Sequence, residues 1–195
     1  AAVDRGEIGL REASRAQVAM MRGSREELVA FALEHCPLDP TFAPFVAWCR
    51  ALGISLTVVS DGFGLYIRPM LEAAGLGNLA IVTNRWVQQD GRPPALRYVS
   101  GHPECVGCGT CKMNAVIAER GRGPVAFVGE GQSDRYGALY ADVVFAKDAL
   151  VDIARADGVA FLPWDDFGDV RAALETIEAI PGPVGGRRCP GWRTA

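Results

Sequence analysis

The chain has 195 residues, 49% of them hydrophobic, and its 20 Lys and Arg residues against 23 Asp and Glu residues give a net charge of −3. This length suits one domain with a sizeable core, no apolar run approaches the ~20 residues of a membrane helix, and no basic stripe is present to follow a nucleic-acid backbone. Because no signal peptide is visible either, we expect a cytoplasmic protein without membrane or nucleic-acid partners.

Apolar runs at helical and strand spacing alternate along the chain. Ser24 precedes Glu27 by three residues, which predicts a capping box, and Gly53 is placed to end a later helix. We expect these elements in chain order: helices over 7–35, a helix over 39–52, a strand over 54–60, a helix over 66–74, a strand over 79–83, a strand pair joined by a turn over 87–100, a helix over 113–120, a strand over 125–128, a helix over 133–140, a strand over 141–145, a helix over 149–156, a strand over 159–162 and a helix over 165–180. This alternation favours an α/β fold with a mostly parallel sheet and helices on both faces. The Pro- and Gly-rich tail, residues 181–195, is expected to be poorly ordered.

Two loops that follow apolar strands concentrate polar residues. The strand over 125–128 leads into a loop, residues 129–134, that contains Glu130 and Asp134. Ligands of open α/β sheets gather beyond the carboxyl ends of the strands, and two carboxylates four residues apart suit a hard cation. An acidic helix start is the alternative interpretation. A second loop of the same design, at residues 60–64, favours a functional site.

The order of these loops resembles motifs two, three and four of the haloacid dehalogenase-like phosphatases. The matching residues are Ser60-Asp61-Gly62, then Lys112 at a helix start, then Gly129-Glu130-Gly131-Gln132-Ser133-Asp134. The likeness also includes VVSDGFGLYIRPMLEAAGL, VAFVGEGQSDRYGALYADVVFAKDAL and FLPWDDFGDV, and it covers roughly residues 5–175. It points to the phosphoserine phosphatase-like subgroup, and within that to the 2-hydroxy-3-keto-5-methylthiopentenyl-1-phosphate phosphatases of methionine salvage. The resemblance implies a Rossmannoid parallel sheet with a helical cap.

The resemblance also implies a reaction, the Mg²⁺-dependent hydrolysis of a small-metabolite phosphate monoester through an aspartyl-phosphate intermediate. Ser60 would then donate its hydroxyl to a phosphoryl oxygen. The backbone amide of Asp61, or the close approach that Gly62 permits, would supply another phosphate contact. Taken alone, Ser60 is equally well explained as a helix cap.

For the helix start at residue 112 and the loop over 129–134, the resemblance implies a lysine and a metal site. Lys112 would place its charge near the phosphoryl group and the nucleophile, and Ser133 would help to orient phosphate or metal ligands. Glu130 and Asp134 would hold Mg²⁺ directly or through water. Glu130 stands where the family usually has aspartate, and its extra methylene is expected to weaken the metal site or alter its ligand arrangement, because Mg²⁺ demands near-ideal geometry.

The first motif of the family has no match in the sequence. That motif is an apolar strand followed by aspartate-x-aspartate-glycine-threonine, and it supplies the nucleophile and the general acid/base. We therefore expect the first, central strand of the sheet to be missing. Residues 1–38 would be the remnant of a helical cap, and residues 39–180 an α/β core without that strand. A polypeptide of only these residues is expected not to hydrolyse phosphate esters by the family mechanism.

A histidine and three cysteines recur every three residues over a stretch of ten. His102, Cys105, Cys108 and Cys111 are four potential ligands for Zn²⁺, which favours four N or S donors. Four ligands from one short run are hard to wrap around one ion, so reduced thiols in a tight loop are the alternative.

Other functions remain open from the sequence. A non-catalytic pseudo-phosphatase or a zinc-stabilised binding module would also account for Glu130 and the missing motif, and two separate chains that complement each other are a third option. Near the end of the core, Trp164-Asp165-Asp166 either shapes the rim of an active site or is an acidic helix start. The sequence does not reveal which phosphorylated metabolite is bound or the oligomeric state.

Overall fold

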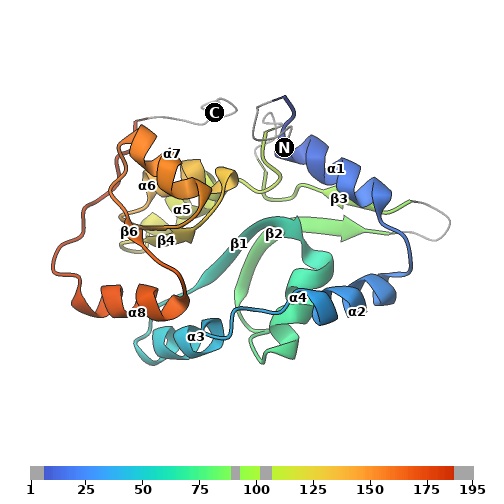
Figure 1. The fold of residues 1–195 in the computed structure, drawn as a ribbon, viewed down its shortest axis with the longest axis horizontal. Coiled ribbons are helices and arrows are strands. Elements are labelled where there is room, and N and C mark those ends of the chain that lie inside the picture. Colours follow the sequence, from blue (N-terminus) through green and yellow to red (C-terminus); the bar gives the residue numbers. More distant parts are fainter. Residues whose placement is uncertain (1–6, 89–92, 102–106, 187–195) are drawn as a thin grey trace. The chain divides into compact units, whose positions relative to one another are not determined.

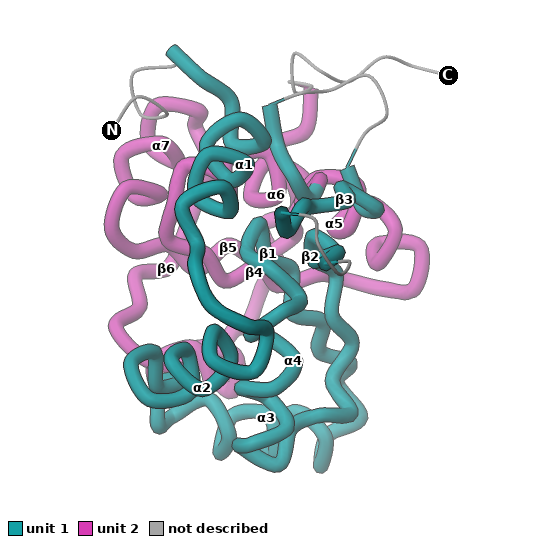
Figure 2. The backbone as a smooth tube through the Cα atoms, turned by 90° about the vertical axis from the view of Figure 1, so that its right-hand side faces the viewer, with its two compact units in different colours: residues 1–110 teal, residues 111–195 magenta. Residues whose placement is uncertain are grey.

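The chain forms two compact units. The computed structural model describes residues 7–88, 93–101 and 107–186. The first unit is Ala1–Thr110 and the second is Cys111–Ala195, coloured separately in Figure 2. Each unit contains a three-stranded sheet, β1-β2-β3 in the first and β4-β5-β6 in the second. None of the helices in the described ranges is long and apolar enough to cross a membrane.

The first unit follows the predicted order of elements. As labelled in Figure 1, they are α1 (Leu10–Met20), α2 (Arg25–His35), α3 (Phe42–Ala51), β1 (Thr57–Phe63), α4 (Gly64–Ala73), β2 (Ala80–Val87) and β3 (Ala95–Arg97). The capping box at the start of α2 is confirmed. Ser24 Oγ accepts from the backbone N–H of Glu27 at 3.2 Å, and Glu27 Oε2 accepts from the N–H of Ser24 at 2.7 Å.

β1 begins three residues later than predicted because the backbone of Ile54 caps the end of α3. Gly53 ends that helix as expected, with φ at 70°, and its N–H donates to the carbonyl of Arg50 at 3.1 Å. The N–H of Ile54 donates to the carbonyl of Cys49 at 2.8 Å. This pair of bonds is a Schellman motif, which satisfies carbonyls that the helix end would leave unpaired.

The sheet of the first unit combines both strand directions. β1 runs parallel to β2, and β2 runs antiparallel to β3 with Trp86 opposite Leu96. The strand pair predicted over 87–100 is therefore formed in part by β2, which continues through Val87; the turn residues 89–92 lie outside the described residues. Trp86 and Leu96 pack against a cluster that includes buried Phe63, and this burial explains the longer strand.

The second unit is an alternation of strands and helices. Its elements are α5 (Lys112–Arg120), β4 (Ala126–Gly129), the short 3₁₀ helix η1 (Gln132–Asp134), α6 (Arg135–Tyr140), β5 (Val143–Ala146), α7 (Ala149–Asp157), β6 (Leu162–Pro163) and α8 (Phe167–Thr176). Its strands are all parallel, as predicted. β6 is shorter than predicted because Val159 caps α7: Gly158 adopts φ at 71°, and the N–H of Val159 donates to the carbonyl of Ala154 at 2.9 Å.

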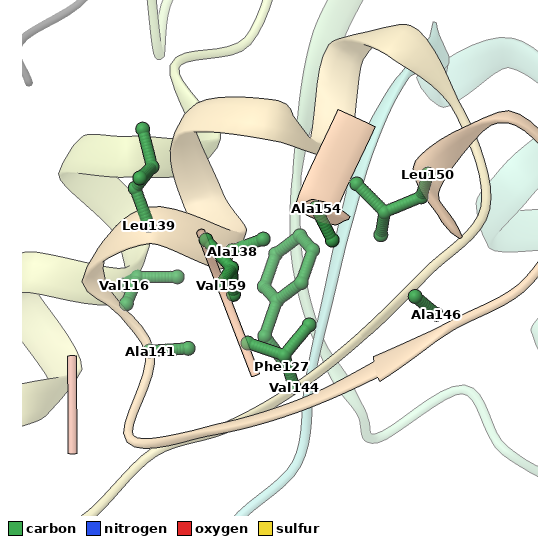
Figure 3. Close-up of a cluster of buried hydrophobic side chains, with 10 residues drawn as sticks. All are labelled: Val116, Phe127, Ala138, Leu139, Ala141, Val144, Ala146, Leu150, Ala154 and Val159. Atoms are coloured by element: carbon green, nitrogen blue, oxygen red, sulfur yellow. The ribbon is translucent and has the colours of Figure 1, made fainter. Parts of the chain in front are cut away.

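The core of the second unit lies between its sheet and its helices (Figure 3). Leu139, Ala146 and Leu150 are completely buried, and the ring of Phe127 projects from β4 into the same cluster. A Cβ at position 137 would lie 2.7 Å from Cε2 of that ring, so only glycine lets α6 approach it this closely. This packing places the residues that follow β4 at one end of a rigid strand.

The tail predicted over 181–195 is partly described. The N–H of Gly182 donates to the carbonyl of Asp142 at 3.1 Å, and that of Gly185 to the carbonyl of Leu139 at 2.9 Å. Residues 187–195 lie outside the described ranges. The bounds of the cap remnant and of the core stay predictions.

Candidate active site

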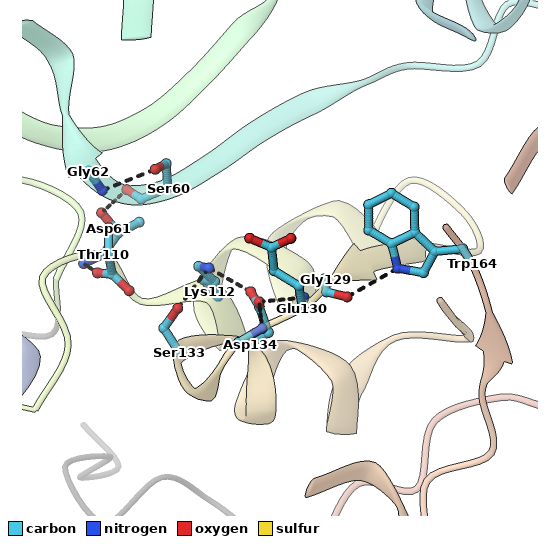
Figure 4. Close-up of polar contacts among 11 residues, drawn as sticks. Ser60, Asp61, Gly62, Thr110, Lys112, Gly129, Glu130, Ser133, Asp134 and Trp164 are labelled. Carbon is cyan, nitrogen blue, oxygen red and sulfur yellow. Dashed lines mark hydrogen bonds and ion pairs between the residues drawn. The ribbon is translucent and has the colours of Figure 1, made fainter. Parts of the chain in front are cut away.

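Residues 60–62, predicted as a loop, lie inside β1, at an irregularity where its pairing with β2 shifts register between Ser60 and Phe63; this closely packed stretch is called the loop at the end of β1 below. Ser60 Oγ accepts a hydrogen bond from the N–H of Gly62 at 3.0 Å (Figure 4). A Cβ at position 62 would lie only 3.1 Å from that oxygen and still closer to the phenol oxygen of Tyr66, so the loop requires glycine there. Burial raises the pKa of Tyr66, which keeps this neighbouring phenol neutral at physiological pH.

Side chains from elsewhere in the first unit hold the same loop. Thr110 donates its N–H to Asp61 Oδ1 at 2.6 Å and its hydroxyl to the carbonyl of Ser60 at 2.9 Å. Asn84 Nδ2 donates to the carbonyl of Asp61 at 2.7 Å, and Thr83 Oγ1 to the carbonyl of Gly62 at 2.9 Å. Sequence analysis missed all three donors. A polar Thr-Asn pair inside an otherwise apolar strand was the available signal.

In the second unit, Lys112 occupies the first position of α5. Its Nζ donates to Ser133 Oγ at 2.9 Å and lies 2.5 Å from Asp134 Oδ1 (Figure 4). The side chains of this ion pair are only 11% and 8% exposed for Lys112 and Asp134. Removing either partner would leave a buried charge without compensation, so the pair fixes the position of the ammonium group. The structure thus brings together three residues that the sequence assigned to one function.

Asp134 uses its second carboxylate oxygen to close the loop before it. Oδ2 accepts from the N–H of Glu130 at 3.0 Å and from the N–H of Gly131 at 2.9 Å. A Cβ at Gly129 would lie 2.8 Å from Cγ of Asp134, which explains the glycine at the end of β4. An ion bound directly by Asp134 would compete with Lys112 and with these amides. The geometry favours Asp134 as the residue that shapes the loop.

Glu130 is the more accessible carboxylate of this loop. Its side chain is 63% exposed, and Oε2 lies 3.8 Å from Nζ of Lys147. Lys147 in turn lies over the ring of Trp164, 3.7 Å from the centroid, a cation–π contact. Trp164 donates its indole N–H to the carbonyl of Gly129 at 3.2 Å. Trp164 therefore belongs to this loop's surroundings, whereas Lys147 was not singled out from the sequence.

The donor chemistry of the second unit is compatible with Mg²⁺. This ion is usually held by one or two carboxylates together with waters and substrate phosphate oxygens, not by a complete protein cage. Glu130 offers such a carboxylate. Across the described residues there is no group of three or more His, Cys, Asp or Glu side chains arranged for a metal. The remaining ligands would come from water and substrate.

The predicted zinc ligands are not supported. His102 and Cys105 lie outside the described residues. Cys108 and Cys111 are partly buried, and the carbonyl of Cys108 accepts from Nε of Arg11 at 2.7 Å, which ties the backbone of this segment to α1. The described ranges contain no candidate zinc cluster. The role of the cysteine run is therefore not assigned to a metal.

An α/β fold with polar motifs at the ends of β1 and β4 and at the start of α5 is typical of phosphatases of the haloacid dehalogenase type. Residues 2–139 match the haloacid dehalogenase-like hydrolase family, and the chain belongs to this family. It is 28% identical over 160 residues to a 2-hydroxy-3-keto-5-methylthiopentenyl-1-phosphate phosphatase of Brevibacillus brevis, a match that covers 79% of this chain and 70% of that protein. A phosphatase of the same name from Bacillus velezensis is 27% identical over 164 residues, with 80% and 67% covered.

A solved structure supports the fold independently. A phosphoserine phosphatase, in a form described as a phospho-aspartyl intermediate analogue, is similar with a TM-score of 0.64 and 17% identity, and the match covers 91% of this chain and 82% of that one. At this identity the likeness concerns the fold. It confirms the fold class expected from the sequence, and the family assignment confirms a hydrolase of the phosphatase type.

Proposed function

We propose that this chain is part of a Mg²⁺-dependent phosphatase that hydrolyses a small phosphorylated metabolite through an aspartyl-phosphate intermediate. The observation that carries the proposal is the buried contact of Lys112 with Ser133 and Asp134. A lysine held by a carboxylate and a hydroxyl keeps one fixed positive charge in a place of low exposure. Such a preorganised charge stabilises a phosphoryl group that gains negative charge during transfer.

In the first unit, the loop at the end of β1 would bind a phosphoryl oxygen. The hydroxyl of Ser60 already accepts from Gly62, and its own proton is available to donate to a phosphoryl oxygen. The backbone amide of Asp61 adds a neutral donor whose position is set by the fold. An amide and a hydroxyl suit a phosphate ester, because hydrogen bonds to its charged oxygens are stronger than those between neutral groups.

Mg²⁺, when bound, would neutralise charge between the nucleophile and the phosphoryl oxygens. Glu130 would provide the carboxylate that this chain contributes, and Asp134 would hold the loop that carries Glu130. The ion pair of Glu130 with Lys147 at 3.8 Å would orient the carboxylate. The glutamate in place of the family's aspartate lengthens the arm that reaches the ion.

The nucleophile would come from polypeptide outside these residues. An aspartate carboxylate attacks phosphorus, the ester P–O bond breaks, and the leaving oxygen takes a proton; water then attacks the aspartyl phosphate and releases phosphate. No segment of the 195 residues matches the motif that supplies this aspartate. We therefore expect a polypeptide of these residues alone to lack the reaction.

The substrate class rests on the relatives. Two relatives with 28% and 27% identity carry the name 2-hydroxy-3-keto-5-methylthiopentenyl-1-phosphate phosphatase, which makes that phosphorylated keto sugar derivative the first metabolite to test. A cytoplasmic location and the lack of nucleic-acid or membrane partners stay predictions from the sequence.

The test compares two polypeptides for Mg²⁺-dependent phosphate release from a generic aryl phosphate. One is this chain, and the other is this chain joined at its N-terminus to the strand and aspartate motif of the Brevibacillus brevis relative. We expect turnover only in the extended chain. The matched control is the same extended chain with the first aspartate of the added motif changed to asparagine, which should be silent because the nucleophile is gone.

Two results would overturn the proposal. Robust metal-dependent turnover by the 195 residues alone would show that the nucleophile lies within them. Silence of the extended chain, with circular dichroism showing that it is folded, would favour a non-catalytic relative that has kept the fold.

A further inference from the structure

Three successive carbonyls in the loop at the end of β1, those of residues 60–62, each accept a hydrogen bond from a side chain outside it. The carbonyl of Ser60 accepts from Thr110 Oγ1, that of Asp61 from Asn84 Nδ2 and that of Gly62 from Thr83 Oγ1, at distances of 2.9, 2.7 and 2.9 Å. In a planar trans peptide the carbonyl and the N–H that follows it point in opposite directions. Three fixed carbonyls therefore fix the directions of the next three N–H groups, those of residues 61–63.

Two of the donors are enclosed in the first unit. Asn84 and Thr110 are each only 1% exposed. Thr110 Oγ1 lies 3.5 Å from Asn84 Oδ1, so the two side chains also meet each other. A Cβ at Gly109 would lie 2.8 Å from Asn84 Oδ1, and glycine at that position allows Thr110 to come this close. Water cannot readily replace donors that are buried to this extent.

Thr110 also restrains the one charged side chain of the loop. Its N–H donates to Asp61 Oδ1 at 2.6 Å, and Figure 4 shows the Asp61 side chain turned toward Thr110. A carboxylate free to swing among phosphate-binding amides would repel an anionic ligand. The same residue thus orients a peptide plane and holds a competing negative charge in place.

We propose that Thr110 and Asn84 are positioning residues of the phosphate-binding loop: Thr110 aims the amide of Asp61 at the phosphoryl group, and Asn84 keeps the amide of Gly62 on Ser60 Oγ. The inference rests on the proposed function. Thr110 lies within the cysteine run, between Cys108 and Cys111, so the Gly109-Thr110 pair gives the end of that run a structural role that needs no bound metal. Neither residue touches the substrate in this proposal, because both act through the loop backbone.

Hydrogen exchange of the Asp61 amide tests the positioning role without any ligand, because this N–H shares a peptide plane with the Ser60 carbonyl that Thr110 holds. Thr110→Val keeps the shape of the side chain and removes the donor to Ser60, whereas Thr110→Ser keeps the donor. We expect exchange at Asp61 to become about tenfold faster in T110V and to stay near the original rate in T110S. T176V is the matched control, because Thr176 also donates to backbone carbonyls, those of Ala172 and Ala173, but on α8.

A binding measurement tests the consequence for the phosphate site. In the extended chain, the inhibition constant of inorganic phosphate should rise about tenfold in T110V and remain unchanged in T110S. If T110V does not fold, T83V removes the donor to the neighbouring carbonyl and should produce the same two effects. Rescue by serine separates positioning from a loss of packing, because serine lacks the methyl group but retains the hydroxyl.

The outcomes separate this inference from the proposed function. Equal exchange rates at Asp61 in T110V, T110S and the original chain would overturn the positioning role. Faster exchange in T110V with an unchanged inhibition constant would also overturn it, because the loop amides would then not bind phosphate. No turnover and no phosphate inhibition in the original extended chain would instead remove the proposed function, while the exchange rates would still decide whether Thr110 holds the loop.

Discussion

At Glu130, one methylene group separates this chain from the aspartate that the family pattern has. The side chain is largely exposed and its ion-pair partner, Lys147, is held against the ring of Trp164. A longer side chain on a rigid loop carries its carboxylate farther from the backbone. It also has more rotamers, so binding an ion costs it more conformational entropy. This single substitution is where we expect the metal site to differ from that of its relatives.

Shortening this side chain should strengthen the site. In the extended chain, Glu130→Asp is expected to lower the dissociation constant for Mg²⁺ several-fold, because the carboxylate would then reach the ion with the geometry that Mg²⁺ demands. Isothermal titration calorimetry with Mg²⁺ alone measures this. Glu130→Gln is the matched control and should weaken binding, since it removes the charge and keeps the length. Tighter binding by the glutamate form than by the aspartate form would contradict the prediction.

At the scale of the elements, hydrogen bonds of Asp142 connect the end of α5 with the beginnings of β4 and β5. Its Oδ2 accepts from the N–H of Val125 at 2.9 Å, and Arg120 contacts both carboxylate oxygens at 3.2 and 3.3 Å. Burial by itself would raise the pKa of Asp142. The Val125 amide and the Arg120 guanidinium outweigh it and hold the pKa below its ordinary value of 3.8.

This contact makes stability depend on pH. Because the pKa of Asp142 is lower in the folded state, its ionised form stabilises the fold above the unfolded pKa, and that stabilisation is lost as the pH falls through the folded pKa. Asp142→Asn should lower the free energy of unfolding by about 2 kcal/mol at pH 7. In urea titrations the difference between the two proteins should shrink below pH 4. A difference that stays constant over this range would contradict the assignment to the ionised carboxylate.

The ends of the helices explain most of the misplaced strand boundaries. Ile54 and Val159 are apolar and follow a glycine, so the sequence pattern assigned both to strands. In the structure each one donates its N–H back to the preceding helix and completes a cap around Gly53 or Gly158. β-branched residues serve equally in a strand and after a helix. Only the backbone hydrogen bonds distinguish the two uses.

At the scale of the whole molecule, each unit has its own core. Leu71 is buried in a cluster of the first unit and Leu150 in a cluster of the second, and no residue belongs to both clusters. The two sheets likewise share no strand. Separate cores allow each unit to lose stability without the other, in which case unfolding is not a single two-state event.

Paired core substitutions test this independence. Leu150→Ala should cost about 3 kcal/mol in the second unit and speed amide exchange in β4 and β5 while leaving β1 and β2 unchanged. Leu71→Ala, the matched control, should show the reverse pattern. Hydrogen exchange followed by NMR or by mass spectrometry of peptides resolves the two sheets. Equal acceleration in both sheets after either substitution would show that the chain unfolds as one cooperative unit.

The sequence by itself determined the succession of elements and the class of protein. Apolar periodicity, the capping box at Ser24 and the glycines after helices are local signals, because they depend on residues within one or two turns of each other. The two polar loops were also visible, since Ser60 and Glu130 each follow an apolar strand directly. Their order along the chain was sufficient to indicate the family.

Only the tertiary structure decided which side chains hold those loops. Thr110 reaches the carbonyl of Ser60 from 50 residues away, and Asn84 reaches that of Asp61 from 23 residues away. Lys112 and Asp134, 22 residues apart, form their ion pair where α5 and the loop after β4 pack together. No local pattern encodes such partners. A hydrogen bond requires two groups within about 3 Å, and only chain packing brings residues so distant in sequence to that separation.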